Sequence, residues 1–124
     1  MSLVGFDHVN VRTANLDAMI EWYVDVLGMT NGPRPGFPFP GAWLYLGDQA
    51  MVHLVGESDG PKNEDVQIEH FAFRAKGKDK FLKMLDAKGV AYKIAVVPDF
   101  DITQVNIWDP DGNHLHIDFA PGDA

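Results

Sequence analysis

Residues 6–12 read FDHVNVR and residues 68–74 read IEHFAFR, and the two stretches match one another position by position. Each begins with an apolar residue, an acid and a histidine, and each ends in an arginine. A second pair of stretches, MVHLV at 51–55 and HLHID at 114–118, repeats at almost the same separation and aligns two further histidines. Two nearly equal separations indicate a duplicated module, and we expect the two copies to be related by a pseudo-twofold axis.

The first copy predicts a strand followed by a helix. Alternation in residues 3–12 favours a strand, with Phe6, Val9 and Val11 as core residues. Asn15 is a suitable N-cap for the helix that follows, and Gly28 is a suitable end. Between them, apolar residues recur at helical spacing, at Leu16, Met19, Ile20, Tyr23 and Leu27.

The rest of the first copy predicts an extended segment and two short strands. Residues 31–41 hold four prolines and three glycines, which disfavour a helix or a central strand and favour a loop or an edge segment. Residues 42–55 then predict two strands around a turn at Gly47 and Asp48.

The second copy predicts the same order after a polar linker at 56–65. A strand is expected over 66–75 and a helix over 77–89, in which Phe81, Leu82 and Leu85 point inward. Three further strands are expected, at 91–97, 102–109 and 113–119. The chain is therefore predicted to be an α+β protein.

Length and composition limit the classes of function. With 124 residues, 46% of them hydrophobic, the chain matches one globular domain, 1–124, with module 1 at 1–57 and module 2 at 64–120. A net charge of -8 argues against a nucleic-acid partner. Without an apolar run of about 18 residues or a signal-like start, we expect a cytoplasmic protein and no membrane partner. The absence of cysteine excludes disulfides and thiolate ligands.

Four of the five histidines fall on one face of the predicted sheets. Side chains alternate along a strand, and each of these histidines lies opposite apolar neighbours that a helix would cover. They are His8, His53, His70 and His116. A single histidine on a polar sheet face is more often a surface residue than a ligand, but four at repeat-related positions favour a metal site.

The fifth histidine, His114, and the acid Asp118 share the face of His116. His114 lies two residues from His116, about 6.6 Å along a strand. Two nitrogens on one ion lie only about 3 to 3.5 Å apart, because each binds at about 2.0 to 2.1 Å. One histidine per strand is the easier geometry, so His114 and Asp118 are expected to hydrogen-bond to ligands or to line the pocket.

These features together resemble the vicinal oxygen chelate superfamily. The resemblance rests on the two βαβββ-like halves, FDHVNVRTANLDAMIEWYVDVLGM at 6–29, IEHFAFR at 68–74 and DPDGN at 109–113. It implies two βαβββ modules forming an open, curled mixed sheet around a divalent metal, commonly in a homodimer. The metal positions that it implies are His8, His53, His70 and His116, the set selected by the repeat.

The chain departs from the superfamily pattern at its metal positions. Members that carry out chemistry usually have glutamate where this chain has His116, and glyoxalase I has glutamate at the place of His53 too. Two histidines there put glyoxalase I activity in doubt and break the two-histidine, one-carboxylate set of the dioxygenases. Neutral imidazoles leave a divalent ion its full charge, which favours an anionic, oxygen-chelating ligand.

Two ligand-binding functions remain in competition, beside a fold retained for assembly alone, with no ligand. The first is a metal-dependent lyase, isomerase or dioxygenase acting on a small molecule, with zinc, iron, nickel, cobalt or manganese as the ion. In it His116, Asp118, Glu69 and His114 are the candidate base and supporting groups. The candidate pocket walls are Phe37, Phe39, Trp43, Tyr45, Tyr92 and Trp108. The second is a metal-free module that binds a small ligand, as bleomycin-resistance proteins do.

Overall fold

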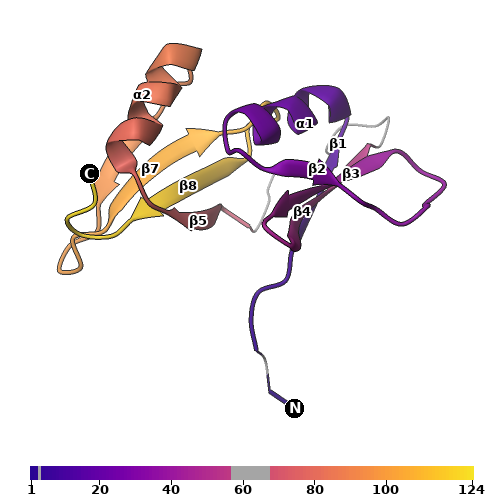
Figure 1. The fold of residues 1–124 in the computed structure, drawn as a ribbon, viewed down its shortest axis with the longest axis horizontal. Helices are drawn as coiled ribbons and strands as arrows, with labels where there is room; N and C mark the ends of the chain where they lie inside the picture. Colours follow the sequence, from indigo (N-terminus) through magenta and orange to yellow (C-terminus); the bar gives the residue numbers. More distant parts are fainter. Residues whose placement is uncertain (3, 57–67) are drawn as a thin grey trace. The chain divides into compact units, whose positions relative to one another are not determined.

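The computed structural model describes residues 1–2, 4–56 and 68–124 and divides into two compact units, Met1–Glu64 (unit 1) and Asp65–Ala124 (unit 2). Each unit runs strand, helix and three strands in the same order (Figure 1). Each therefore repeats the βαβββ pattern, and the α+β prediction is confirmed. Most of the predicted linker lies outside the described residues, and that the two units form one domain stays a prediction.

Unit 1 is a four-stranded mixed sheet with one helix. Its elements are β1 (Val9–Thr13), α1 (Leu16–Asp25), β2 (Thr30–Gly32), β3 (Gly41–Leu46) and β4 (Gln49–Gly56). The strand order is β1-β4-β3-β2, with β1 parallel to β4 and the other pairs antiparallel. Both outer strands are short. The edge strand β2 overlaps the start of the proline-rich segment, which was expected to be a loop or an edge segment.

Unit 2 has the same topology. Its elements are β5 (Phe71–Ala75), α2 (Lys78–Lys88), β6 (Lys93–Val96), β7 (Thr103–Trp108) and β8 (His114–Phe119). The strand order is β5-β8-β7-β6, and β5 runs parallel to β8. The two sheets show that the repeat in the sequence is a repeat in the fold.

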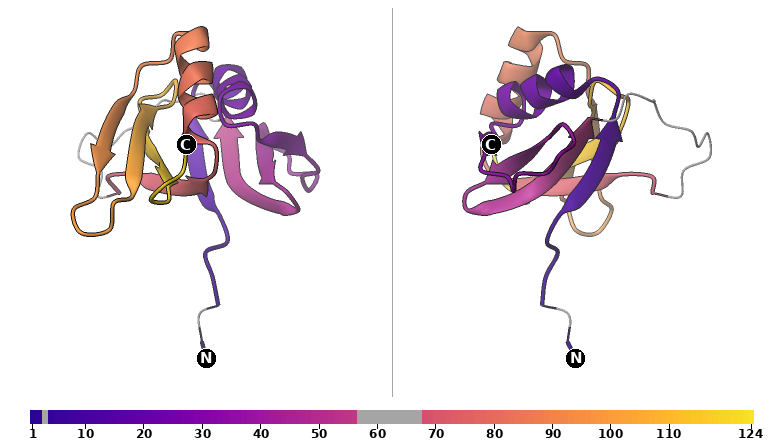
Figure 2. Two further views of the ribbon diagram at one scale, coloured as in Figure 1. Left: turned by 60° about the vertical axis from the view of Figure 1, so that its left-hand side comes forward. Right: turned by 90° about the vertical axis from the view of Figure 1, so that its right-hand side faces the viewer.

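In each unit the helix covers one face of the sheet, as the two views of Figure 2 show. In unit 1, Met19 and Tyr23 of α1 are fully buried, as are Leu44 and Val52 of the sheet. In unit 2, the ring of Phe81 on α2 lies 5.8 Å from that of Phe119 on β8. The core lies on the helix side, so the opposite face is left for polar and aromatic side chains.

Several element boundaries differ from the sequence predictions. The first strand begins at Val9, and Phe6 lies before it, 67% exposed, so its assignment to the core was wrong. The strand expected over 66–75 begins at Phe71, with its first two residues outside the described part. In both cases the backbone pairs with the neighbouring strand only from that point on. Alternation by itself does not reveal where a partner strand ends.

Both helices agree with prediction to within a few residues. Asn15 occupies the N-cap of α1 but its side chain makes no capping hydrogen bond. At the end of α2, Gly89 adopts a φ of 69°, a left-handed conformation that glycine reaches without strain. Among the described residues, no helix is long and apolar enough to cross a membrane.

Candidate metal centre

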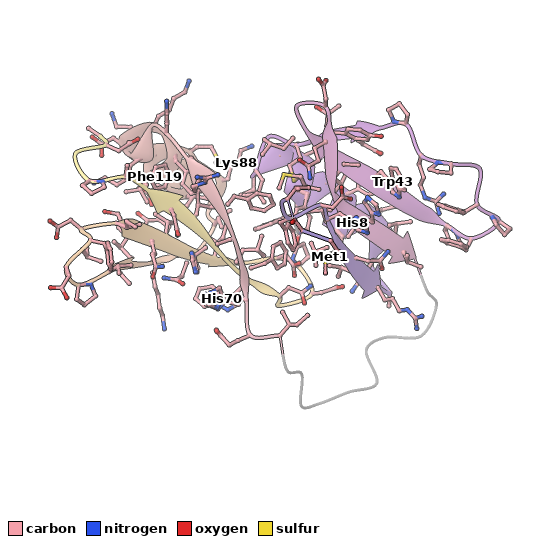
Figure 3. The ribbon with its side chains drawn as sticks, turned by 90° about the horizontal axis from the view of Figure 1, so that it is seen from below. Met1, His8, Trp43, His70, Lys88 and Phe119 are labelled. Carbon is pink, nitrogen blue, oxygen red and sulfur yellow. The ribbon has the colours of Figure 1, made fainter. Side chains whose placement is uncertain are left out.

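The two histidines of unit 1 form an aromatic stack on the face away from the helix. His8 lies just before β1 and His53 lies on β4, and their rings stack with centroids 3.8 Å apart and an interplanar angle of 11°. Trp43, directly opposite His53 on β3, stacks on it at 4.0 Å and 11°. Figure 3 labels His8 and Trp43 on this sheet. The stack limits the rotation of both imidazoles.

The hydrogen bonds of these two imidazoles differ. His8 Nδ1 lies 2.7 Å from Asp7 Oδ2, so it donates to the carboxylate and leaves Nε2 free for a ligand. His53 Nε2 lies 3.0 Å from the carbonyl oxygen of Ala50. A carbonyl only accepts, so this bond places the proton of His53 on Nε2 and leaves Nδ1 as its lone-pair nitrogen.

The environment of His53 favours its neutral form. Burial, and then the proximity of His8, hold the pKa of His53 below its ordinary value of 6.5. A neutral imidazole is the form that binds a metal ion or stacks in an apolar surrounding. His53 is therefore suited to either competing function.

Two hollows adjoin the stack. The larger, of about 540 Å³, is lined by His8, Trp43, Tyr45 and His53 together with the carboxylates Asp7 and Asp48. The smaller, of about 140 Å³, is lined by Asn10, Arg34, Phe37, Phe39, Trp43, His53, Leu54 and Val55. Four of the six candidate pocket residues thus lie around hollows in unit 1. The other two lie in unit 2, where the Tyr92 hydroxyl donates to Asp86 and Trp108 stacks on His114 at 5.1 Å.

In unit 2, one carboxylate joins two histidines. Glu69 Oε2 lies 2.9 Å from His70 Nδ1, and Glu69 Oε1 lies 2.9 Å from His114 Nδ1. One ligand atom from each of the three residues can be chosen so that all lie within 4.8 Å of one another. Figure 3 labels His70, which lies just before β5. This cluster brings two predicted supporting residues, Glu69 and His114, to the same place as a predicted ligand.

Glu69 is ionised in this arrangement. Hydrogen bonds from His70, and then from His114, hold the pKa of Glu69 below its ordinary value. On its other side, His114 Nε2 lies 2.8 Å from Asn106 Oδ1, while Asn106 Nδ2 donates to the carbonyl of Lys93 at 3.2 Å. The amide oxygen of Asn106 therefore accepts from Nε2, which leaves Nδ1 as the nitrogen of His114 that faces Glu69.

The fourth predicted ligand, His116, lies close to this cluster and has its own carboxylate. Its ring centroid is 4.5 Å from that of His70, and its Nδ1 lies 2.5 Å from Asp118 Oδ1. The residue is buried, with 7% of its surface exposed. His116 therefore has Nε2 as its free nitrogen, held in direction by Asp118.

Three of the four predicted ligands share this arrangement. His8, His70 and His116 each have Nδ1 bonded to a carboxylate, from Asp7, Glu69 and Asp118 respectively. Metal-binding histidines usually donate their second nitrogen in this way, which sets the tautomer and the ring direction. The donor set of imidazole nitrogens and a carboxylate suits zinc, iron, nickel, cobalt and manganese.

The sequence analysis missed two of these groups. Asp7 was not predicted as a site residue, although the repeat aligns it with Glu69, which was predicted. Asn106 had no signal in the sequence, since only the pairing of β7 with β8 brings it opposite His116. The complete set of four histidines takes two residues from each unit, and it stays a prediction.

Comparison with known proteins identifies the fold family. The model of the Glyoxalase/Bleomycin resistance protein/Dioxygenase superfamily matches residues 5–117. Among curated proteins, none matches the chain closely enough to count as a recognised relative.

Several solved structures share the fold. A glyoxylase/bleomycin resistance protein/dioxygenase domain from Frankia sp. EAN1pec is 21% identical, with a TM-score of 0.80 over 98% of this chain and 95% of that one. A lactoylglutathione lyase from Agrobacterium tumefaciens is 22% identical, with a TM-score of 0.74 over 96% of each chain. A glyoxalase family protein from Enterococcus faecalis is 22% identical, with a TM-score of 0.72 over 92% and 96%. At these identities the likeness shows the fold alone.

Proposed function

The chain belongs to the Glyoxalase/Bleomycin resistance protein/Dioxygenase superfamily, and from this premise we propose that it is a divalent-metal-dependent enzyme. The proposed substrate is a small, anionic molecule with neighbouring oxygen atoms that can chelate the ion. The proposed reaction is that of a lyase, an isomerase or a dioxygenase. The observation that carries the proposal is the cluster of Glu69, His70 and His114, whose ligand atoms lie within 4.8 Å of one another.

The charge of this donor set supports an anionic substrate. As metal ligands the two imidazoles are neutral and Glu69 contributes one negative charge, so a divalent ion bound by the three would keep a net positive charge. When bound, such an ion acts as a Lewis acid that polarises a substrate oxygen. Glu69 also supplies a carboxylate within unit 2, where the residue at 116 is histidine.

The pair of His116 and Asp118 is suited to accept a proton. Asp118 accepts from Nδ1 of His116, which leaves Nε2 with its lone pair. This is the arrangement by which a carboxylate orients a histidine and stabilises its imidazolium. We assign His116 as the general base for removal of a proton next to a carbonyl group, with Asp118 as its positioning residue.

Metal content tests the proposal. Protein purified without a metal-affinity tag is reconstituted with Zn²⁺, Fe²⁺, Ni²⁺, Co²⁺ or Mn²⁺, and bound metal is measured by mass spectrometry. We expect close to one equivalent of at least one metal. The variants Glu69→Gln, His70→Ala and His114→Ala should each lower its affinity by about tenfold or more.

The control is Glu21→Gln, which removes an exposed carboxylate from α1 and should leave metal binding unchanged. Binding of less than about a tenth of an equivalent of every metal would end the proposal. Unchanged affinity in all three cluster variants would remove the ligand assignment.

A metal-free ligand-binding function is the second candidate. The observation that favours it is the stack of His8, His53 and Trp43 beside a hollow of about 540 Å³. That volume lies within the range of small-molecule pockets, about 300 to 1,000 Å³, and stacked rings suit a flat ligand. Ligand binding that persists with EDTA, in protein that binds no metal, would favour this candidate.

Assembly and location complete the proposal. Proteins of this superfamily often form dimers, and we propose a homodimer, which light scattering of the purified chain tests directly. The cytoplasmic location stays a prediction.

A further inference from the structure

We infer that Arg34 binds the carboxylate of a small, flat acid on the surface of unit 1. The inference rests on the proposed function for the expectation of an anionic ligand. Arg34 lies in the proline-rich segment between β2 and β3 and lines the hollow of about 140 Å³. Nothing in the repeat predicts this residue, because the aligned part of the second copy does not include the segment.

The guanidinium group is held in place by its own loop. Its Cζ atom lies 5.1 Å from the ring centroids of both Phe37 and Phe39, and the two rings stack at 5.0 Å and 11°. Arg34 Nη2 donates to the carbonyl oxygen of Phe39 at 2.9 Å. The cation–π contacts and this hydrogen bond restrict the side chain, so less freedom is lost when a ligand binds.

The guanidinium can approach the backbone closely because residue 41 is glycine. A Cβ atom at Gly41 would lie 2.9 Å from Arg34 Nη2, and it would also contact the carbonyl oxygen of Leu54. The guanidinium therefore lies directly against the first residue of β3. This places the cation at the rim of the hollow that Trp43 and His53 also line.

The charge of Arg34 has no counter-ion among the described residues. One of its N–H groups is used by Phe39, and its other donors remain for a ligand. This cation stands in a chain with a net charge of -8. A carboxylate fits the fork of a guanidinium with two parallel hydrogen bonds, which makes it the preferred ligand for a positioned arginine.

The two hollows set the direction of the ligand. The larger one carries Asp7 and Asp48 and repels a carboxylate, whereas the smaller one carries Arg34. Trp43 and His53 line both hollows, so a ligand can place its charged end at Arg34 and its uncharged body along these rings. A volume of about 140 Å³ suits one end of a ligand, and its aromatic walls suit a flat, unsaturated body.

Binding of benzoate to the full chain tests the inference, with benzamide as the uncharged molecule of the same shape. NMR spectra of the EDTA-treated protein report on the Arg34 Nε–H and Trp43 Nε1–H signals. We expect benzoate to shift both signals and benzamide to bind at least about tenfold more weakly. Arg34→Gln should weaken benzoate about tenfold or more, and Arg34→Lys should weaken it less, because lysine keeps the charge and loses the fork.

The control is Lys80→Gln, which removes one positive charge from the exposed face of α2 and should leave benzoate affinity unchanged. The inference is overturned if benzoate causes no shift at millimolar concentration, if benzamide binds equally well, or if Arg34→Gln binds benzoate as the parent does. Because EDTA is present, these results are independent of metal. Arg34-dependent benzoate binding in a chain that takes up no metal would support the inference while the proposed function fails.

Discussion

At the scale of the residue, the feature that stands out is a carboxylate beside each of three histidines. Asp7 and Glu69 immediately precede His8 and His70 in the chain, and Asp118 follows His116 by two residues along β8. Each carboxylate selects the tautomer in which Nδ1 carries the proton. The free nitrogen of each histidine is therefore Nε2, whether it meets a metal ion or a substrate proton.

Asp118→Asn should test this role without removing an imidazole. The amide keeps the shape of the side chain and loses the charge, so we expect metal affinity or turnover to fall by about tenfold to a hundredfold. The NMR signals of His116 should also show a change in tautomer. Asp79→Asn, at an exposed position on α2, serves as the control, and equal metal affinity and turnover in Asp118→Asn and the parent would count against a positioning role.

The pKa of His53 gives a pH-dependent prediction. Burial lowers this pKa, so the unfolded chain binds the proton more tightly than the folded one does. The neutral form of His53 therefore contributes its full share of the folding free energy above pH 6.5. This contribution is lost as the pH falls from 6.5 toward the pKa of His53 in the folded protein. NMR titration of metal-free protein should place the His53 midpoint below 6.5, and His8→Gln should raise it by removing a like charge. A midpoint above 6.5 would contradict the described burial.

At the scale of the element, helix α2 depends on a residue near the end of the chain. Gly77 occupies its N-cap in a left-handed conformation and has no side chain to cap the helix. The carboxylate of Asp123 takes that place by accepting from the backbone N–H groups of Gly77 at 3.1 Å and Lys78 at 2.8 Å. A negative group at a helix start also interacts favourably with the helix dipole.

Asp123→Ala should lower the free energy of unfolding by about 1 kcal/mol, the usual effect of losing a cap. Asp123→Asn should lose less, because its amide oxygen still accepts a hydrogen bond. Urea denaturation followed by circular dichroism measures both. The control is Glu21→Ala, which removes an exposed carboxylate from α1, and an equal loss in both alanine variants would show that the cap is not the cause.

Gly41, the first residue of strand β3, lies close to both the Leu54 backbone and the Arg34 side chain. A Cβ atom at Gly41 would contact the backbone oxygen of Leu54 on β4 as well as Arg34. We expect Gly41→Ala to destabilise the protein by about 1 to 3 kcal/mol, because backbone cannot move aside as the end of a side chain can. Gly36→Ala, in the same segment with open space around it, is the control and should change stability little.

At the scale of the whole molecule, the duplication produces two units that each have a small core. Unit 1 buries Met19, Tyr23 and Leu44, and unit 2 buries Leu85, Leu115 and Phe119. A chain of about 60 residues buries only about 60% of the surface that its unfolded form exposes, so such units are marginal alone. We therefore predict that the two units fold as one cooperative domain.

Leu115→Ala in unit 2 tests this prediction. Removing a fully buried leucine should cost about 2 to 5 kcal/mol. If the chain is one cooperative domain, the NMR signals of Trp43 in unit 1 and Trp108 in unit 2 should be lost at the same, lowered urea concentration. Loss of the Trp108 signal first, with the Trp43 midpoint unchanged, would show two independent units.

The order of the elements, and the alternation that sets His53 and His116 apart from their apolar neighbours, could be predicted from the sequence. Both follow from local regularities: a period of two in strands, of 3.6 in helices, and the repeat of FDHVNVR in IEHFAFR. The structure confirms the order of the elements, and it places His53 opposite Trp43 and His116 opposite Asn106, whereas His8 and His70 lie just before β1 and β5. The start of β1 was predicted too early, because alternation continues past the last pairing partner.

Which side chains meet depends on how the strands pair and where the loops run. Glu69 reaches His114, and Asn106 reaches the same histidine, through the pairing of β5 and β7 with β8. Arg34 lines the same hollow as Trp43, and its guanidinium lies against Gly41. These contacts join residues that are far apart in the sequence and follow no repeat. They depend on strand register and on the path of the loops, and neither can be predicted from local sequence patterns.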